Sequence, residues 1–198
     1  VPEVIRLTGA TAYGSPNTCQ LLSTLDIPGS QVHAIKVGDK FVLDPFNVEV
    51  IQGQHSWIPL GQVLNGSLPM NIKLPLHTWD YRMDTCLGYS ITVQDVRLLI
   101  CAAKPRPAEV LFTVAQEPTQ YYTRMFGEVK PKTFVPIHWD NFTRSLELPL
   151  RQLIRPGRIS LQRLIRLAQQ TLPGCQVILP EVFREYPVPT SFGSSQDH

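Results

Sequence analysis

One stretch decides the fold of this 198-residue chain: Phe134-Val135-Pro136-Ile137-His138-Trp139-Asp140-Asn141-Phe142. An apolar, β-prone run ends at a histidine, and an aromatic residue and a carboxylate follow at the start of a loop. This order places the imidazole of His138 at the tip of a buried strand, where a rigid element can hold it over a cleft. Histidine is the commonest metal ligand and the side chain that titrates nearest neutral pH. The simpler alternative is a core histidine hydrogen-bonded to a neighbouring backbone group. The two alternatives differ in whether the rest of the chain provides further metal ligands.

The composition narrows the classes of function. The 18 basic and 16 acidic side chains give a formal charge of +2, which offers no reason to invoke nucleic acid or an acidic membrane surface. Charged residues make up 17% of the chain, below the roughly 25% of a typical globular domain. Such an apolar surface indicates that part of it is reserved for another chain or for another part of a larger fold.

The chain carries no signal-peptide pattern at Val1-Pro2-Glu3 and no apolar run long enough to span a membrane. Its cysteines lack C-x-x-C spacing, and each lies in or beside an apolar run: Cys19, Cys86, Cys101 and Cys175. This pattern is typical of reduced core thiols and predicts a cytoplasmic protein.

Strands outnumber helices in the expected element order, and the two types are interleaved, which predicts a layered α/β or α+β architecture. The expected helices cover residues 16–25 (capped by Ser15), 118–126 and 159–172. The expected strands are a short one ending at 13, a hairpin of 32–37 and 41–43 around Gly38-Asp39, 47–51, a second hairpin of 88–93 and 96–102, then 109–115, 132–137 and 176–179.

The periodicity fails over residues 57–84, which prolines and glycines punctuate. A loop of this length in a compact domain is usually functional or disordered. Its apolar content favours a packed cover over a cleft. We expect a single domain over residues 1–186 and a frayed tail over 187–198, which is rich in Pro, Ser and Gly.

Histidines are the main candidate ligands. His33 lies within the first predicted hairpin and is expected to be solvated, and His198 is terminal. His77 lies in the long loop, where it faces either a cleft or solvent. His55 and His138 share a setting, because each ends a strand and is followed closely by a tryptophan. These two are therefore the best candidates for direct chemistry.

Residue chemistry alone provides one or two possible metal ligands and no complete site. A catalytic zinc needs about three protein ligands and an open position for water. The sequence has no His-x-His pair, no His-Glu-x-x-His helix and no paired cysteines. It also has no nucleophile elbow, phosphate-binding loop or dinucleotide fingerprint.

The order of features nevertheless resembles the metallo-β-lactamase fold superfamily, and more narrowly the later part of a metal-dependent hydrolase. The matching residues are Tyr13-Gly14-Ser15-Pro16-Asn17-Thr18, the Val37-Gly38-Asp39 turn, the strand into His55, and Pro136-Ile137-His138-Trp139-Asp140-Asn141-Phe142. The resemblance implies an αββα sandwich, present here mainly as its second half, with zinc or another divalent metal as cofactor. It implies that His138 is the last metal-binding histidine, and that His55 lies near the cleft without being a standard ligand.

The sequence departs from this superfamily at its metal ligands. The strand over 96–102 would match the one that ends in a metal-bridging aspartate, but it ends Ile100-Cys101-Ala102-Ala103. Cys101 could supply a thiolate, although a buried cysteine in an apolar strand is more often inert. The motif His-x-His-x-Asp-His is missing, and so is the next histidine ligand. Zinc is therefore expected to bind this chain weakly if at all.

Two functions remain open. The first is the C-terminal portion of a small-molecule hydrolase, whose metal site is completed by a missing N-terminal half or a second chain. His55, His77 and Trp139 would then shape the substrate cleft, and Asp140 would orient the turn or the imidazole of His138. The second is a metal-free binding or assembly module that keeps half of the fold, as a homodimer or with another chain. Half of a sandwich would leave an apolar sheet face and a strand edge open.

Overall fold

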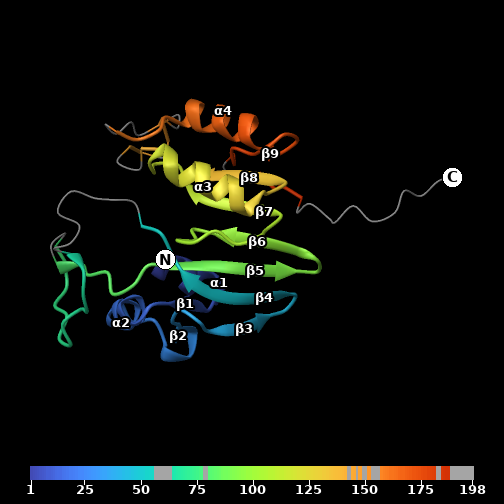
Figure 1. The fold of residues 1–198 in the computed structure, drawn as a ribbon. Helices are drawn as coiled ribbons and strands as arrows, with labels where there is room; N and C mark the ends of the chain where they lie inside the picture. Colours follow the sequence, from blue (N-terminus) through green and yellow to red (C-terminus); the bar gives the residue numbers. More distant parts are fainter. Residues whose placement is uncertain are drawn as a thin grey trace.

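A seven-stranded mixed sheet organises the chain, in the order β3-β4-β5-β6-β7-β8-β9 (Figure 1). The computed structural model describes residues 1–55, 64–77, 80–141, 144–145, 147–148, 151–152, 157–181 and 184–187. The strands are β3 (Lys40–Leu43), β4 (Phe46–Gln52), β5 (Leu87–Val93), β6 (Val96–Ile100), β7 (Val110–Val114), β8 (Thr133–Ile137) and β9 (Gln176–Val177). A separate parallel pair joins β1 (Ala12–Gly14) to β2 (Val32–Ala34).

The strand directions bring the carboxyl ends of β4, β6, β7, β8 and β9 to one edge of this sheet. The pairs β3-β4, β4-β5 and β5-β6 are antiparallel, so β4 runs in the same direction as β6. Strands β6 to β9 are parallel. The loops after β4, β6, β7 and β8 therefore leave the sheet on the same side, which is where functional groups gather in open α/β sheets.

The helices are α1 (Pro2–Thr8), α2 (Pro16–Thr24), α3 (Thr119–Val129) and α4 (Leu161–Thr171), with a 3₁₀ turn η1 (Gly29–Gln31). Helix α2 begins as predicted: Pro16 occupies its first turn and the Ser15 hydroxyl accepts a hydrogen bond from the Thr18 N–H. Helix α1 was not predicted from the sequence. Its signals are Pro2 at the start and Gly9, in the left-handed region, at the end.

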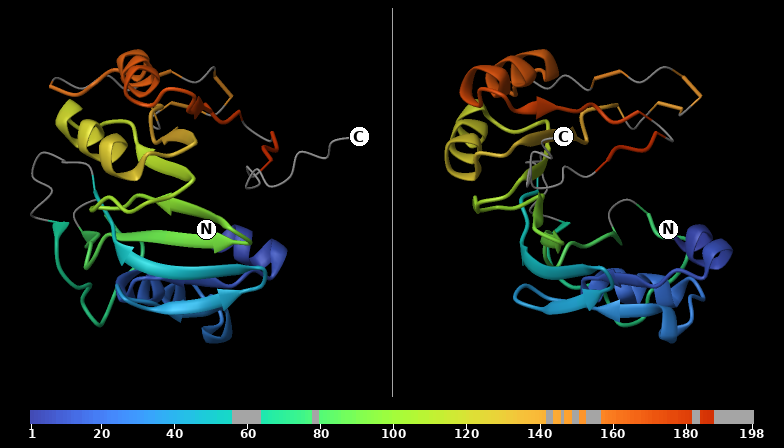
Figure 2. Two further views of the ribbon diagram at one scale, coloured as in Figure 1. Left: turned by 45° about the vertical axis from the view of Figure 1, so that its right-hand side comes forward. Right: turned by 90° about the vertical axis from the view of Figure 1, so that its right-hand side faces the viewer.

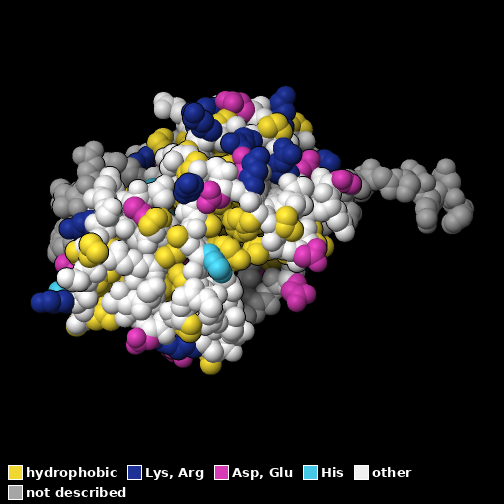
Figure 3. All heavy atoms as spheres, turned by 90° about the horizontal axis from the view of Figure 1, so that it is seen from below, with side chains coloured by type: hydrophobic (Ala, Val, Ile, Leu, Met, Phe, Trp, Pro, Cys, Tyr) yellow, Lys and Arg dark blue, Asp and Glu magenta, His cyan; other side chains and the backbone are white. Residues whose placement is uncertain are grey.

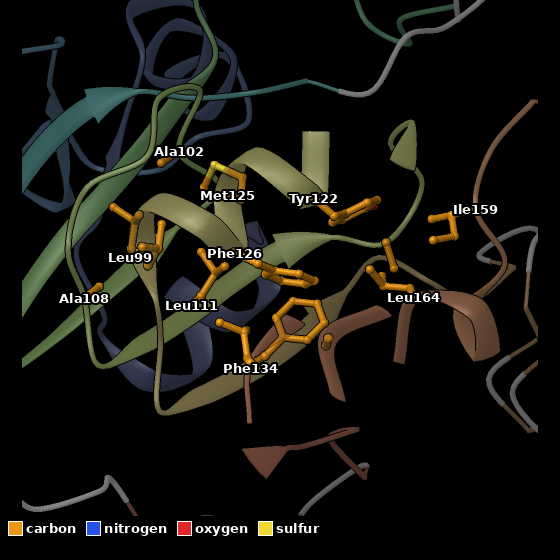
Figure 4. Packing of buried hydrophobic residues seen from close by; sticks show 14 of the residues in the cluster. Leu99, Ala102, Ala108, Leu111, Tyr122, Met125, Phe126, Phe134, Ile159 and Leu164 are labelled. Carbon is orange, nitrogen blue, oxygen red and sulfur yellow. The ribbon is translucent and has the colours of Figure 1, made fainter. Parts of the chain in front are cut away.

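The main core lies between the sheet and helices α3 and α4, which cover one face (Figure 2). Figure 4 shows Leu111 and Phe134 of the sheet beside Phe126 and Tyr122 of α3. The rings of Phe126 and Phe134 meet edge to face, with their centroids 5.0 Å apart. All four of these side chains are fully buried, as expected for a close-packed interior.

The opposite face of the same strands is covered less completely. Val96, Val110 and Val135 are buried there, whereas Leu98 and Phe112 are only partly buried. A cavity of about 300 Å³ lies on this face. Its walls include Leu98, Val110, Phe112, Val135, Ile178 and Tyr186. The sheet thus has one sealed face and one face whose apolar side chains remain accessible.

The second predicted hairpin is confirmed, with Val93 opposite Val96, but the first is wrong. Strand β2 pairs parallel with β1, and β3 pairs antiparallel with β4 through a two-residue loop at Asp44-Pro45. The turn at Gly38-Asp39 instead leads the chain away from β2, because the Asp39 carboxylate accepts from the Lys36 N–H and Gly38 N–H donates to Val50 O. His33 is exposed, as predicted, and stacks on Tyr13.

The described part of the long loop packs against α2. Asn17 is buried, and its side-chain amide donates to the carbonyl oxygens of Gly66 and Arg82 at 2.8 and 2.9 Å. Its side-chain oxygen accepts from the Leu68 N–H at 3.0 Å. Packing against α2 is therefore seen near Gly66, Leu68 and Arg82, whereas Met70 and Leu74 are exposed, and the predicted cover over a cleft stays a prediction. Residues 56–63, 78–79 and 188–198 lie outside the described residues, and with them most of the predicted tail.

The architecture is the mixed α+β class that the sequence predicts. Within the described ranges, no helix has both the length and the apolar character that crossing a bilayer requires.

Candidate functional site at the carboxyl edge of the sheet

Hydrogen bonds join the loops at the carboxyl edge of β4, β6, β7 and β8. The Gln54 N–H, after β4, donates to the Cys101 carbonyl oxygen, after β6, at 2.8 Å. The side-chain amide of Gln116, after β7, donates to the His138 carbonyl oxygen, after β8, at 2.9 Å. The edge is therefore a connected surface rather than a set of independent loops.

Gly53 allows the chain after β4 to approach this edge. It forms an isolated antiparallel bridge with Ala102, and its N–H donates to Cys86 O at 2.8 Å. A Cβ atom at Gly53 would lie 2.5 Å from the Leu87 carbonyl carbon, closer than any real contact. The absence of a side chain thus lets residues 53–55 run beside the end of β6. This close approach has no signature in the hydrophobic pattern.

His138 stands where the sequence predicts, directly after β8. It is exposed and has a positive φ of 53°, which is uncommon for a residue with a side chain. Trp139 is half-buried and packs against the main core. Asp140 is half-buried and pairs in an isolated bridge with Gln152. The turn is therefore anchored on both sides of the imidazole, and the orienting role of Asp140 stays a prediction.

The other two candidate histidines differ in position. His55 is exposed and follows Gln54, so it lies at the same edge as Cys101. His77 is exposed in a turn of the long loop, where its N–H donates to the Asp80 carboxylate at 2.8 Å. The structure thus places His55 and His138 on one edge of the sheet. The predicted cleft roles of His55, His77 and Trp139 stay predictions.

Cys101 occupies the strand end where the resemblance implies a carboxylate. Burial raises the pKa of its thiol, and the nearby Cys86 raises it further. Burial also raises the pKa of the Cys86 thiol. Only the thiolate is a good metal ligand, so these surroundings favour the form that does not bind metal. All four cysteines of the chain are free thiols.

Gln116 and Glu117 are the functional candidates that sequence reasoning missed. They follow β7 directly, and their side chains are buried, with 2% and 4% of their surface exposed. The Oε1 atoms of both residues are buried without a hydrogen-bond partner. Two polar residues after a buried strand that ends beside the strand of His138 are a signal that the sequence does contain.

Two tyrosines of α3 hold this turn in place. The Tyr122 hydroxyl accepts from the Glu117 N–H at 2.9 Å and donates to Val114 O at 2.6 Å. The Tyr121 hydroxyl donates to Ala102 O at 3.2 Å. Burial raises the pKa of both phenols, and the Glu117 charge raises it further, so both hydroxyls stay protonated at neutral pH.

The described residues do not form a complete zinc site. Among them, no group of three or more His, Cys, Asp or Glu side chains comes together in a way that would hold a metal ion. Zinc in a catalytic site has about three protein ligands.

Comparison with known proteins supports the fold. A candidate metal-dependent hydrolase from Parabacteroides distasonis superimposes with a TM-score of 0.53 and 13% identity, over 90% of this chain and 69% of that one. In its fold, this chain is similar to a metal-dependent hydrolase. Two further solved structures, described as a metallo-β-lactamase fold protein and as a zinc-dependent hydrolase of that superfamily, superimpose with lower TM-scores.

The first of these is the Bacillus subtilis protein YhfI, with a TM-score of 0.49 and 12% identity, over 85% of this chain and 61% of that one. The second is a candidate zinc-dependent hydrolase from Thermotoga maritima, with a TM-score of 0.42 and 5% identity, over 75% and 71%. No protein-family model matches the sequence, and no curated protein matches it closely.

Proposed function

We propose that this chain is the C-terminal portion of a metallo-β-lactamase-type, metal-dependent hydrolase of small molecules. Its metal site would be completed by residues outside this chain, from a preceding N-terminal half or from a second chain. His138 would be a metal ligand from this chain. The substrate class would be an ester, an amide or a phosphoester.

The observation that carries this proposal is the connected carboxyl edge around His138. An exposed histidine is held there on a buried strand, between an anchored tryptophan and a buried amide. The fold is similar to that of a metal-dependent hydrolase. The described residues nevertheless lack a full ligand set, so ligands from elsewhere would have to be supplied.

The open surfaces of the sheet are a second support. The face of β6, β7 and β8 away from α3 and α4 contains the apolar cavity described above. Strand β3 forms an edge of the sheet, and Val42, Leu43 and Phe46 are exposed near it. Seen from below, from the side on which β3 lies in Figure 1, the molecule shows hydrophobic side chains gathered near the centre of the view (Figure 3). Apolar surface of this kind favours a covering partner.

Co-expression tests the proposal. The chain would be produced with and without a polypeptide that carries His-x-His-x-Asp-His, and the purified material would be assayed for bound zinc and for hydrolysis of generic esters. We expect zinc and activity only with the partner, and we expect both to fall in a His138→Ala complex. A His33→Ala complex is the matched control, because His33 is exposed on β2, where it stacks on Tyr13, and has no role in the proposed site. Full zinc in the His138→Ala complex would contradict the role of His138.

One observation favours the alternative, a metal-free binding or assembly module. The end of β6 carries Cys101, whose raised thiol pKa disfavours metal binding, in place of a carboxylate. A monodisperse homodimer without metal or hydrolysis would support this module. Under either proposal we place the protein in the cytoplasm, on the support of its four free cysteines.

A further inference from the structure

A cavity of about 410 Å³ lies on strands β3 to β6, at the end of the sheet away from α3 and α4 (Figure 1). Its walls include Asn47, the second residue of β4, and Arg97, the second residue of β6. Both residues lie at the amino ends of strands whose carboxyl ends lead to His55 and Cys101. The cavity is therefore separate from the carboxyl edge, and the proposed hydrolase does not use it.

The strand register brings the polar residues of this cavity onto one face of the sheet. Lys40 is opposite Glu49, and Glu49 is opposite Ser90. Thr92 is two residues from Ser90 along β5 and is opposite Arg97. Opposite residues, and residues two apart along a strand, project to the same face. These five side chains are therefore held together by rigid strands, which position binding groups more precisely than loops do.

Three cations act on one carboxylate in this cavity. Arg106, from the loop after β6, donates from Nη1 to Glu49 Oε1 at 2.9 Å. This hydrogen bond lowers the pKa of the Glu49 carboxyl, and the charges of Lys40 and Arg97 lower it further. The Arg97 guanidinium is itself placed by a 3.4 Å hydrogen bond to the Pro107 carbonyl oxygen. The three positive groups therefore converge on the same part of the sheet.

The lining carries two more positive charges than negative ones. Glu49 is the one carboxylate among the described lining residues, against Lys40, Arg97 and Arg106. The ion pair at the cavity is Glu49 with Arg106, and neither Lys40 nor Arg97 lies within ion-pair distance of a carboxylate in the described ranges. The Glu109 carboxylate, outside the lining, accepts from the Arg97 backbone N–H rather than from its guanidinium. A fixed surplus of two positive charges favours an anion with two negative charges.

We propose that this cavity binds the phosphate group of a small molecule through Lys40, Arg97 and Arg106. A phosphate monoester carries about 1.5–2 negative charges at neutral pH, which matches the surplus of the lining. The planar fork of an arginine donates two parallel hydrogen bonds to phosphate oxygens. The Thr92 hydroxyl and the Asn47 amide add uncharged donors to the same cavity. Its volume falls within the roughly 300–1,000 Å³ of small-molecule sites.

NMR titration of the chain itself tests this site, with inorganic phosphate and phenyl phosphate as probes at constant ionic strength. We expect saturable shifts of the backbone amide signals of Ser90, Thr92 and Arg97 with at least one probe. Tighter binding of phenyl phosphate would identify a monoester as the ligand, and equal binding would identify free phosphate. Arg97→Gln should weaken binding about tenfold, because a hydrogen-bonded charge is lost.

Glu49→Gln tests the charge surplus through a gain of affinity, which a misfolded variant cannot produce. The change removes the one described carboxylate of the lining and frees Arg106 from its ion pair. Phosphate should therefore bind severalfold more tightly. Arg166→Gln is the matched control for Arg97→Gln, because it removes the same charge from an exposed position on α4, beside a different cavity. It should leave binding unchanged.

Shifts that do not saturate, or that spread over exposed cations throughout the chain, would overturn the site. So would weaker binding in Glu49→Gln. Binding that is lost in Arg166→Gln and kept in Arg97→Gln would place the anion beside α4 and would also overturn it. The wild-type titration decides the question even if a variant does not fold. The test needs no metal, partner or activity, so its result is independent of the proposed hydrolase.

Discussion

The two faces of the seven-stranded sheet differ in how completely they are covered. Under α3 and α4, Leu111 and Phe134 are fully buried against aromatic rings of α3. On the opposite face, Phe112 comes from the same strand as Leu111 but remains partly accessible beside the 300 Å³ cavity. Adjacent residues of one strand thus point into very different surroundings.

The covered face stabilises the chain, whereas the open face remains available for a partner. A sealed core gives the sheet its rigidity, and rigid elements position functional side chains better than loops do. The open face contributes less to stability and leaves apolar surface to be covered. The carboxyl edge with His138 borders both faces of the sheet. The covered face holds this edge in place, and the edge stays accessible beside the open face.

Truncating one phenylalanine on each face should produce the largest effect. We expect Phe134→Ala to lower the free energy of unfolding by about 3–5 kcal/mol, because it empties a fully buried site. Phe112→Ala should cost about 1–2 kcal/mol, because less apolar area returns to water. Urea denaturation monitored by tryptophan fluorescence measures both. Equal losses would show that the open face is packed as tightly as the covered one.

A methyl group at Gly53 should disturb the crossing that leads to the carboxyl edge. We expect Gly53→Ala to cost about 1–3 kcal/mol, because the new Cβ would overlap the Leu87 carbonyl. Gly127→Ala is the control, since nothing lies within 4 Å of a Cβ there and Gly127 is within α3. It should stabilise the protein by about 0.5–1 kcal/mol. Thermal unfolding compares the two, and a harmless Gly53→Ala would refute the tight crossing.

Removing the Tyr122 hydroxyl should loosen the turn after β7. Tyr122→Phe leaves the Glu117 N–H and the Val114 carbonyl oxygen without this partner, which should cost about 1–3 kcal/mol. Tyr81→Phe, at an exposed tyrosine, should change stability very little. Hydrogen exchange at Glu117 supplies a local measurement. Unchanged exchange there in Tyr122→Phe would show that the hydroxyl does not hold the turn.

The smallest effect concerns Asp84, which ties the long loop to α2. Burial alone would raise the pKa of Asp84, but hydrogen bonds from the Asn17 N–H and the Ser15 hydroxyl outweigh it and lower the pKa. A lowered folded-state pKa means that the stabilisation is present above about pH 4 and is lost as the pH falls through the folded-state value.

Limited proteolysis of residues 64–84 at neutral and acidic pH checks this effect with an acid-tolerant protease. We expect faster cleavage at low pH in the wild type. Asp84→Asn should cleave quickly at both pH values, since it cannot accept these bonds as a charged group. Cleavage that is independent of pH in the wild type would show that the Asp84 carboxylate does not hold the long loop against α2.

Local sequence signals predicted a helix or strand well where its position depends only on its own residues. Ser15-Pro16 fixed the start of α2, and the run into His138 fixed β8. The first hairpin failed because strand pairing depends on distant partners: β2 pairs with β1, and β3 pairs with β4 across Asp44-Pro45. Periodicity reports which face of a strand is apolar and does not report its neighbour.

The candidate site was predicted in part for the same reason. His138 ends a strand with a clear apolar pattern, so its position could be read from the sequence. The approach of His55 to the edge depends on the contact between Gly53 and Leu87, which are far apart in the sequence. The unsatisfied oxygens of Gln116 and Glu117 are a property of three-dimensional burial that no linear pattern contains.

Zinc binding to the purified chain tests the central claim most directly. The chain would be stripped of metal, dialysed against micromolar zinc with a weak competing chelator, and assayed for bound metal. The account predicts clearly substoichiometric zinc, because the described residues provide too few ligands. One tightly bound zinc per chain, lost in His138→Ala, would show that the site is complete within this chain and would contradict the account.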